Sequence, residues 1–170
     1  MTRRKLRVFT IGVYGASRET FFAALERAGA DVLIDIRRRR AVRGPRYTFA
    51  NAARLTAELE RLGIAYRHEL GLAPSAAMLK LQHEADARAK RLLSERTELA
   101  PGYVKRYTAQ VLERFDFDAL AAELTGFRAP VLMCIERIPA ACHRSLAAPR
   151  LARALGTDDV DHLVPVESAG

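Results

Sequence analysis

Short apolar runs that end in polar residues alternate with helical patterns early in the chain, and this alternation restricts the fold more than any other feature. The apolar runs span residues 6–12, 31–37 and 64–71. Residues 17–29 and 51–63 carry apolar side chains at helical spacing, and each segment ends in glycine. The order strand, helix, strand, helix, strand with short connections is typical of a parallel sheet with crossover helices.

The second half of the chain adds a helical insertion and two further strands. The predicted elements are the insertion at about 74–126, strands at 129–136 and 160–166, and a helix at 145–156. We therefore expect a single α/β domain over residues 1–170. Its architecture is predicted to be three-layer and Rossmann-like, with a mostly parallel five-stranded sheet flanked by helices. Pro149 does not suit a helix interior, so the last helix is expected to begin later or to kink there.

Positive charge is concentrated near the N-terminus. The 170 residues carry a formal net charge of +8. Residues 1–46 hold 12 Lys or Arg against 4 Asp or Glu, whereas residues 47–170 hold 16 of each, so the first segment accounts for the whole excess. Such a field attracts polyanions. We expect an anionic small molecule or nucleic acid as partner, although a solvated basic surface has the same composition.

Several classes of protein and site are disfavoured. No apolar stretch approaches the roughly 18 residues of a membrane span. The apolar part of "MTRRKLRVFTIG" is too short for a signal peptide, so we expect a cytoplasmic protein without membrane contact. Two cysteines are too few for a disulfide framework or a four-ligand zinc ribbon. Cys134, inside a predicted strand, is interpreted as a small core residue. No metal site is predicted, and the sequence identifies no cofactor.

Polar side chains stand at the ends of the predicted strands. Tyr14 follows the first strand, Asp35 and Arg37 close the second, and Glu136 ends the fourth. Ligands of open parallel sheets bind beyond the carboxyl ends of the strands, so these residues are expected to line one cleft. Asp35 can orient Arg37, and Arg37 can hold an anion through two hydrogen bonds. An ordinary ion pair would give the same pattern.

The stretch "MCIERIPAACHRSL", residues 133–146, concentrates reactive and charged groups between a strand and a helix. Cys142 and Arg144 lie where the free N–H groups of a helix start favour an anion and lower the pKa of a thiol. Cys142 is therefore a candidate nucleophile, and Arg144 a candidate anion-binding group. His143 is a candidate general base, and Glu136 a candidate acid–base group. The alternatives are a buried thiol, a helix-capping imidazole and a surface arginine.

The loop after the second strand holds six arginines within residues 37–46, followed by Tyr47 and Phe49. Charge beside aromatic faces suits a phosphate backbone with stacked bases, and Arg38 and Arg40 are candidate contacts. A solvated loop without a ligand has the same composition. The position of this loop beside the predicted cleft favours a role in gathering an anionic substrate.

Four short motifs follow one another in a fixed order. They are "TIG" after the first strand, "DIR" after the second, "ELG" after the third and "CIERIPAACHRSL" near the end. In these motifs the chain resembles the uncharacterised family known as domain of unknown function 488. The resemblance implies a small α/β protein without an established activity. It also implies a shared site at Asp35, Arg37, Glu136, Cys142, His143 and Arg144. Members commonly have His-Ser where this chain has Val13 and Tyr14.

Two functions remain open from the sequence. The first is an enzyme, with hydrolysis as the candidate reaction, acting on a nucleotide, a nucleic acid or a phosphorylated metabolite at a cleft formed by the Asp-x-Arg and Cys-His-Arg motifs. The second is a non-catalytic nucleic-acid-binding module that uses the arginine-rich loop 37–46. Thiol sensing through Cys142 is a further alternative.

Overall fold

The computed structural model describes residues 5–92 and 95–166, and a parallel sheet crosses its centre. The strands are β1 (Val8–Ile11), β2 (Val32–Asp35), β3 (Ala65–His68), β4 (Pro130–Met133) and β5 (Val160–Leu163). Every pairing is parallel, and the strand order is β3-β2-β4-β1-β5. The predicted five-stranded sheet is confirmed. Its strands are shorter than predicted because the polar residues that follow them leave the ladder and form loops.

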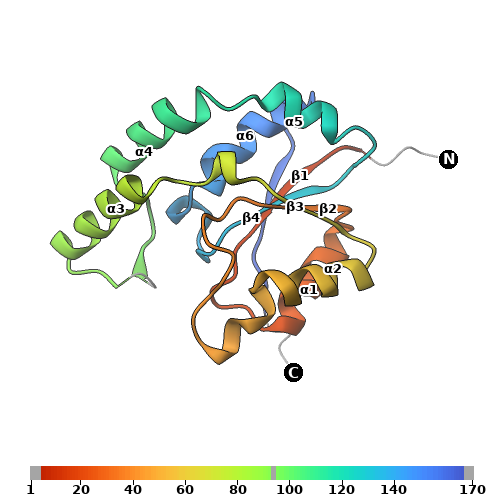
Figure 1. Cartoon of the computed structure of the whole chain (residues 1–170), viewed down its shortest axis with the longest axis horizontal. Helices are drawn as coiled ribbons and strands as arrows, with labels where there is room; N and C mark the ends of the chain where they lie inside the picture. The colour runs from red at the N-terminus through yellow and green to blue at the C-terminus, as the bar shows by residue number, and fades with distance from the viewer. Residues whose placement is uncertain (1–4, 93–94, 167–170) are drawn as a thin grey trace.

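Helices cover both faces of the sheet (Figure 1). The helices α1 (Arg18–Ala28) and α2 (Ala52–Arg61) lie on one side, and α4 (Pro101–Tyr107), α5 (Phe117–Glu123) and α6 (Arg144–Ala154) lie on the other. This arrangement confirms the predicted three-layer α/β fold.

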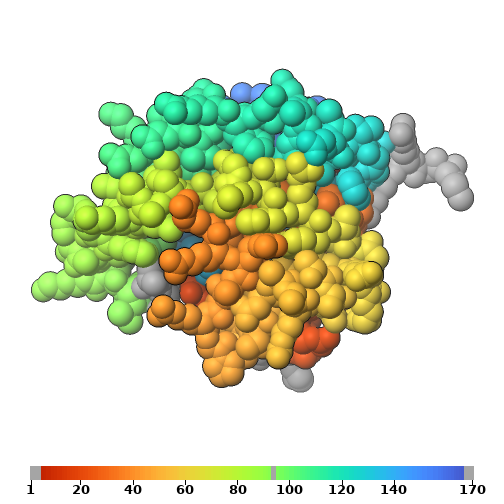
Figure 2. Space-filling view, viewed as in Figure 1, coloured from red at the N-terminus to blue at the C-terminus, as the bar shows by residue number. Residues whose placement is uncertain are grey.

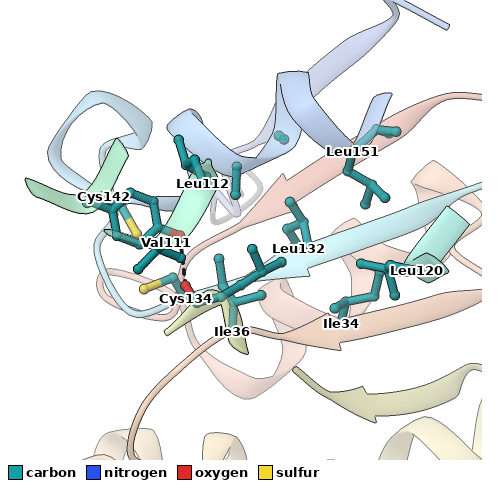
Figure 3. Packing of buried hydrophobic residues seen from close by; sticks show 14 of the residues in the cluster. Ile34, Ile36, Val111, Leu112, Leu120, Leu132, Cys134, Cys142 and Leu151 are labelled. Atoms are coloured by element: carbon teal, nitrogen blue, oxygen red, sulfur yellow. Dashed lines mark hydrogen bonds between the residues drawn. The ribbon is translucent and has the colours of Figure 1, made fainter. Parts of the chain in front are cut away.

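Alternate strand residues supply two separate cores. In β2, Leu33 packs in the cluster that contains α1 and α2, whereas Ile34 packs in the cluster that contains α6. In β4, Val131 and Leu132 divide in the same way. Figure 3 shows the α6 side of the sheet, where the apolar cluster continues to Cys134 beyond the end of β4.

The ends of α1 follow directly from its sequence. The Ser17 side chain accepts a hydrogen bond from the Thr20 N–H at 3.1 Å and caps the first turn. Gly29 ends the helix at φ 62°, in the left-handed region that glycine adopts without strain.

Asn51, the residue just before α2, does not cap its helix with its side chain. Its Oδ1 accepts from the Val42 N–H at 2.8 Å, and this bond holds the arginine-rich loop against α2.

The insertion between β3 and β4 contains α3 (Ala76–Arg88), then α4, a π-helical turn (Thr108–Leu112) and α5. Residues 89–92, 96–100 and 113–116 form turns and loop, so the prediction of helix throughout 74–126 is wrong there. Arg96 in this connection forms a buried ion pair with Asp86 of α3, described below. Within the described ranges, no helix is both long and apolar enough to cross a membrane.

Helix α6 contains the proline that the sequence analysis singled out. The helix begins at Arg144, slightly earlier than predicted, and Pro149 lies inside it on the exposed side. Because proline has no N–H, the Ser145 carbonyl loses its helical donor. The opposite face buries Ala147, Ala148 and Leu151, and this packing holds the helix in spite of the proline.

Candidate functional site

The carboxyl ends of β1, β2 and β4 border a cavity of about 800 Å³. Figure 2 shows its opening as a hollow between the orange arginine-rich loop and the yellow-green helix α3. This volume falls within the range of small-molecule sites, roughly 300–1,000 Å³. The polar and reactive residues that line it are Tyr14, Arg37, Arg38, Arg39, Arg43, Lys80, Gln82, His83, Glu84, Arg96, Tyr103, Cys134, Glu136, Cys142 and His143.

Most of the predicted site residues meet at this cavity. Six of them line it, namely Tyr14, Arg37, Arg38, Glu136, Cys142 and His143. Asp35 does not line the cavity but binds Arg37 from behind. Arg40 and Arg144 are absent from the lining. The side chain of Arg40 is directed to Tyr66, with which it forms a hydrogen bond that raises the Arg40 pKa.

Asp35 fixes the position of Arg37. The Asp35 carboxylate accepts from Arg37 Nε at 2.8 Å and from Nη2 at 2.7 Å, and it also accepts from the Arg37 backbone N–H. The Tyr66 hydroxyl donates a further bond to Asp35 at 2.9 Å. The Arg37 side chain is only 1% exposed, and its Nη1 is buried with no hydrogen-bond partner in the described part of the chain.

Glu136 places a carboxyl group on the cavity wall. Its Oε1 lies 3.4 Å from Arg96 Nη1. Burial raises the pKa of Glu136 to about 7, against the opposing influence of Arg96 and Arg144. Burial, and after it the nearby Glu136 charge, raises the Tyr14 pKa as well. A carboxyl group with such a pKa can exchange a proton near neutral pH.

Two sulfurs and an imidazole gather at the inner end of the cavity. His143 Nδ1 lies 3.5 Å from Cys134 Sγ and 3.8 Å from Cys142 Sγ. Burial and the hydrogen bond with Cys142 raise the pKa of Cys134. Burial also acts to raise the pKa of Cys142, but the hydrogen bond with Cys134 and the charge of His143 outweigh it, so this pKa is lowered. In Figure 3 both sulfurs lie at the same end of the apolar cluster.

Arg144 organises the loop that carries Glu136. Its guanidinium donates to the Thr10 hydroxyl at 3.2 Å, to the backbone carbonyl of Glu136, and to the carbonyl of Arg137 at 3.1 Å. The side chain is fully buried. All three nitrogens of this guanidinium therefore have partners within the protein, and the group holds the loop after β4 onto β1.

The protein-family comparison matches residues 17–151 to the family described as domain of unknown function DUF488. The chain belongs to the DUF488 family. The match contains every predicted site residue except Tyr14, and it extends from α1 into α6. No curated protein and no solved structure is significantly similar to this DUF488 chain.

The DUF488 cavity also contains residues that the sequence analysis did not single out. Arg96 is 7% exposed and binds Asp86 through Nε at 3.0 Å, while Gln82 donates to the same carboxylate. The Gln82 side-chain oxygen accepts from the Ala100 N–H at 2.8 Å and so joins α3 to the start of α4. These residues lie among many other charged residues of the insertion, and no local pattern marks them as buried.

Proposed function

We propose that this DUF488 protein is an enzyme that acts on a small phosphate-bearing molecule held in the cavity. The observation that carries the proposal is the state of Arg37, a buried guanidinium on the cavity wall with one nitrogen unpartnered among the described residues. A buried charged donor without an acceptor is costly. A phosphate oxygen would supply that acceptor, and Asp35 keeps the guanidinium in place for it.

The charge of the cavity supports an anionic substrate. Six basic residues line it, namely Arg37, Arg38, Arg39, Arg43, Lys80 and Arg96, against the two acidic residues Glu84 and Glu136. In the described part of the chain, Arg38, Arg39 and Arg43 form no ion pair. These three exposed arginines surround the buried Arg37, so a substrate with more than one phosphate would meet positive charge along its length.

A small substrate fits these observations better than a nucleic-acid strand. Arg37 is almost fully buried, so a compact terminal group reaches it more readily than a polymer backbone. Other arginines of the same loop are engaged elsewhere. Arg46 Nη2 donates to the Gly15 carbonyl at 3.4 Å, and its guanidinium lies 5.6 Å from the Tyr47 ring centroid. The loop therefore does not present its arginines as one continuous surface.

Proton transfer is assigned to Glu136 in this proposal. Both nitrogens of His143 are occupied within the protein, Nδ1 by the two sulfurs and Nε2 by the Ile36 carbonyl at 3.1 Å. Glu136 lines the cavity and keeps one carboxylate oxygen clear of any hydrogen bond in the described part of the chain. It is therefore the group best placed to exchange a proton with a substrate.

Calorimetric titration with inorganic pyrophosphate tests the binding part of the proposal. The informative variant is Arg37→Lys, because lysine keeps a positive charge beside Asp35 but cannot present the third nitrogen. We expect binding to weaken by roughly 10- to 100-fold, as for a lost hydrogen bond to a charged group. Arg46→Lys is the matched control in the same loop and should bind normally. Equal affinity of the Arg37→Lys and original proteins would contradict the proposal.

Hydrolysis of a panel of phosphate monoesters, diesters and nucleotides tests the catalytic part. Glu136→Gln keeps the size of the side chain but removes its acid–base chemistry, and we expect turnover to fall by roughly 100-fold or more. Pyrophosphate binding and melting temperature should change little. Turnover that survives this substitution would remove Glu136 from the proposed mechanism, and a protein that binds pyrophosphate but turns over no substrate in the panel would count against an enzyme.

A further inference from the structure

The cluster at the inner end of the cavity has the composition of a transition-metal site. Cys134 follows β4, Cys142 follows a short 3-10 turn (Pro139–Ala141), and His143 directly precedes α6. The two sulfurs and one imidazole nitrogen all lie within 4.8 Å of one another, and all three residues are buried. The strand, the turn and the start of the helix thus deliver two soft sulfur ligands and one imidazole nitrogen to one point.

The separations between the imidazole nitrogen and the two sulfurs fit tetrahedral coordination. Zinc binds sulfur at about 2.3 Å and imidazole nitrogen at about 2.0–2.1 Å, so a tetrahedral ion places its sulfur and nitrogen ligands roughly 3.6 Å apart. The observed separations from His143 Nδ1 are 3.5 Å to Cys134 Sγ and 3.8 Å to Cys142 Sγ. The two sulfurs lie within 4.8 Å of each other and would stand about 3.8 Å apart around a bound ion, so the imidazole is already in place and the thiols need a small approach.

A hydrogen bond to the Ile36 backbone orients the His143 ring for metal binding. His143 Nε2 lies 3.1 Å from the Ile36 carbonyl oxygen, which can only accept a hydrogen bond. Nε2 therefore carries a proton, and in the neutral ring the lone pair stands on Nδ1, which faces the two sulfurs. Metal-binding histidines commonly donate their second nitrogen to a carbonyl or carboxylate in this manner, which fixes the ring orientation.

We propose that Cys134, Cys142 and His143 bind a zinc-like divalent ion through two thiolates and one imidazole. Three protein ligands leave one tetrahedral position open, which is the pattern of catalytic rather than structural zinc sites. All three residues line the cavity, so a water molecule or a substrate oxygen can fill that position. The ligand role replaces the nucleophilic role expected of Cys142. It goes beyond the proposed function and requires no part of it.

The sequence predicts no metal site because two cysteines are too few for a four-ligand zinc ribbon. Seven residues separate the two cysteines, Cys134 stands at the end of a strand, and His143 adjoins Cys142. This spacing resembles no short zinc motif. Only the turn at 139–141, which brings the chain back over the end of β4, places both sulfurs beside one imidazole.

Cobalt spectroscopy tests the site directly. The full-length protein, reduced and freed of metal with a chelator, is titrated with Co²⁺ in the absence of phosphate. We expect one equivalent to bind, with sulfur-to-cobalt charge-transfer absorption and the intense visible bands of tetrahedral cobalt, and Zn²⁺ should displace it. A reduced protein that takes up no Co²⁺, or takes it up without sulfur absorption, would contradict the proposal.

Single substitutions identify the ligands. Cys134→Ser, Cys142→Ser and His143→Gln should each weaken Co²⁺ binding by at least 10-fold, since even changes outside the direct ligands cost roughly 10- to 100-fold. His83→Gln is the matched control, because His83 lines the same cavity outside the cluster. Unchanged cobalt spectra in the Cys134→Ser protein would overturn the site.

Cadmium NMR on the unsubstituted protein gives the same answer without any variant. The chemical shift of bound cadmium depends on the number of sulfur ligands, so two sulfurs are expected and a shift typical of oxygen and nitrogen alone would contradict the proposal. Pyrophosphate binding to the metal-free protein is measured separately. A failure of the metal site is thereby distinguished from a failure of the anion site.

Discussion

Asp35 and Arg37 depend on each other at the scale of single residues. The Asp35 carboxylate accepts four hydrogen bonds, three of them from Arg37, and it is fully buried. Replacing Asp35 with Asn would leave the guanidinium charge uncompensated in the interior. We expect urea denaturation to show a loss of roughly 3–5 kcal/mol in the free energy of unfolding.

A surface ion pair serves as the control for that substitution. Glu58 binds Arg18 and Arg61, both of which are well exposed, so Glu58→Gln should change the free energy of unfolding little. If Asp35→Asn were as mild as Glu58→Gln, Asp35 would not be the residue that holds Arg37 in place.

Gly12 lets the loop that carries Glu136 approach β1. A Cβ atom at this position would lie 1.9 Å from the Glu136 carbonyl oxygen and 3.1 Å from Arg144 Nη1. We therefore expect Gly12→Ala to displace this loop and to cost roughly 1–3 kcal/mol of folding free energy, as overpacking does. Turnover of the phosphate-ester panel should also fall, because Glu136 would move with the loop.

Gly102 provides the comparison, because a Cβ atom there meets no atom within 4 Å. Gly102→Ala lies in α4 and should maintain or increase stability, by up to about 1 kcal/mol. Equal thermal stability of the two alanine variants would show that the close approach at Gly12 is relaxed at no cost.

The sequence indicated the character of these residues but not their partners. "DIR" suggested the Asp35–Arg37 pair, because the two residues close one strand. Arg144 was expected to face a ligand, yet its guanidinium is occupied by Thr10 and two backbone carbonyls. Those acceptors lie on β1 and in the loop after β4. They come together around Arg144 only because β1 and β4, distant in sequence, pair in the sheet.

At the scale of elements, α3 forms a wall of the cavity through one buried ion pair. Asp86 on α3 binds Arg96, which lies in the irregular connection and reaches Glu136. We expect Asp86→Asn to release this wall, so that hydrogen exchange of the α3 amides accelerates by roughly 10-fold or more while exchange in the sheet stays unchanged.

Lys80→Met is the control on the same helix, because the Lys80–Glu84 pair is exposed and spans 3.9 Å. Its α3 amides should exchange at the original rate. Slow exchange in both variants would mean that α3 is held by its apolar contacts alone.

The strands and helices of this fold were predictable because their patterns are local. The apolar runs that became β1, β2 and β4 are bounded by glycine or charge, and α1 carries its own cap in Ser17. The irregular connection after α3 was not predicted, because no local pattern marks its Arg96 as the buried partner of Asp86, ten residues away. The boundary of α6 shifted for a similar reason, since tertiary packing tolerates Pro149.

At the scale of the whole molecule, part of the excess positive charge near the N-terminus lies beside the cavity. Part of the N-terminal excess lies on the cavity rim as Arg38, Arg39 and Arg43. Replacing these three with Ala should weaken pyrophosphate binding by at least roughly 10-fold and reduce its dependence on salt. Calorimetry at several salt concentrations measures both effects.

The matched control replaces Arg27, Arg54 and Arg61 with Ala, which removes the same charge from exposed positions that do not line the cavity. Binding should remain close to that of the original protein. If both triple variants weakened binding equally, net charge rather than the cavity would explain the affinity.

The order of the strands is the part of the fold that the sequence did not reveal. The β-α-β pattern predicts parallel strands, but it does not specify that β4 lies between β2 and β1. That placement brings the end of β4, with Cys134 and Glu136, between Arg37 and Gly12. The site therefore depends on β4 pairing with both β1 and β2, which happens only when the whole sheet assembles.

A crystal structure of the protein soaked with phosphate tests the central claim most directly. We expect phosphate in the cavity, with one oxygen within hydrogen-bond distance of Arg37 Nη1 and the Asp35–Arg37 pair unchanged. Phosphate found only at surface arginines, with Arg37 Nη1 still unpartnered at saturating concentration, would contradict the account.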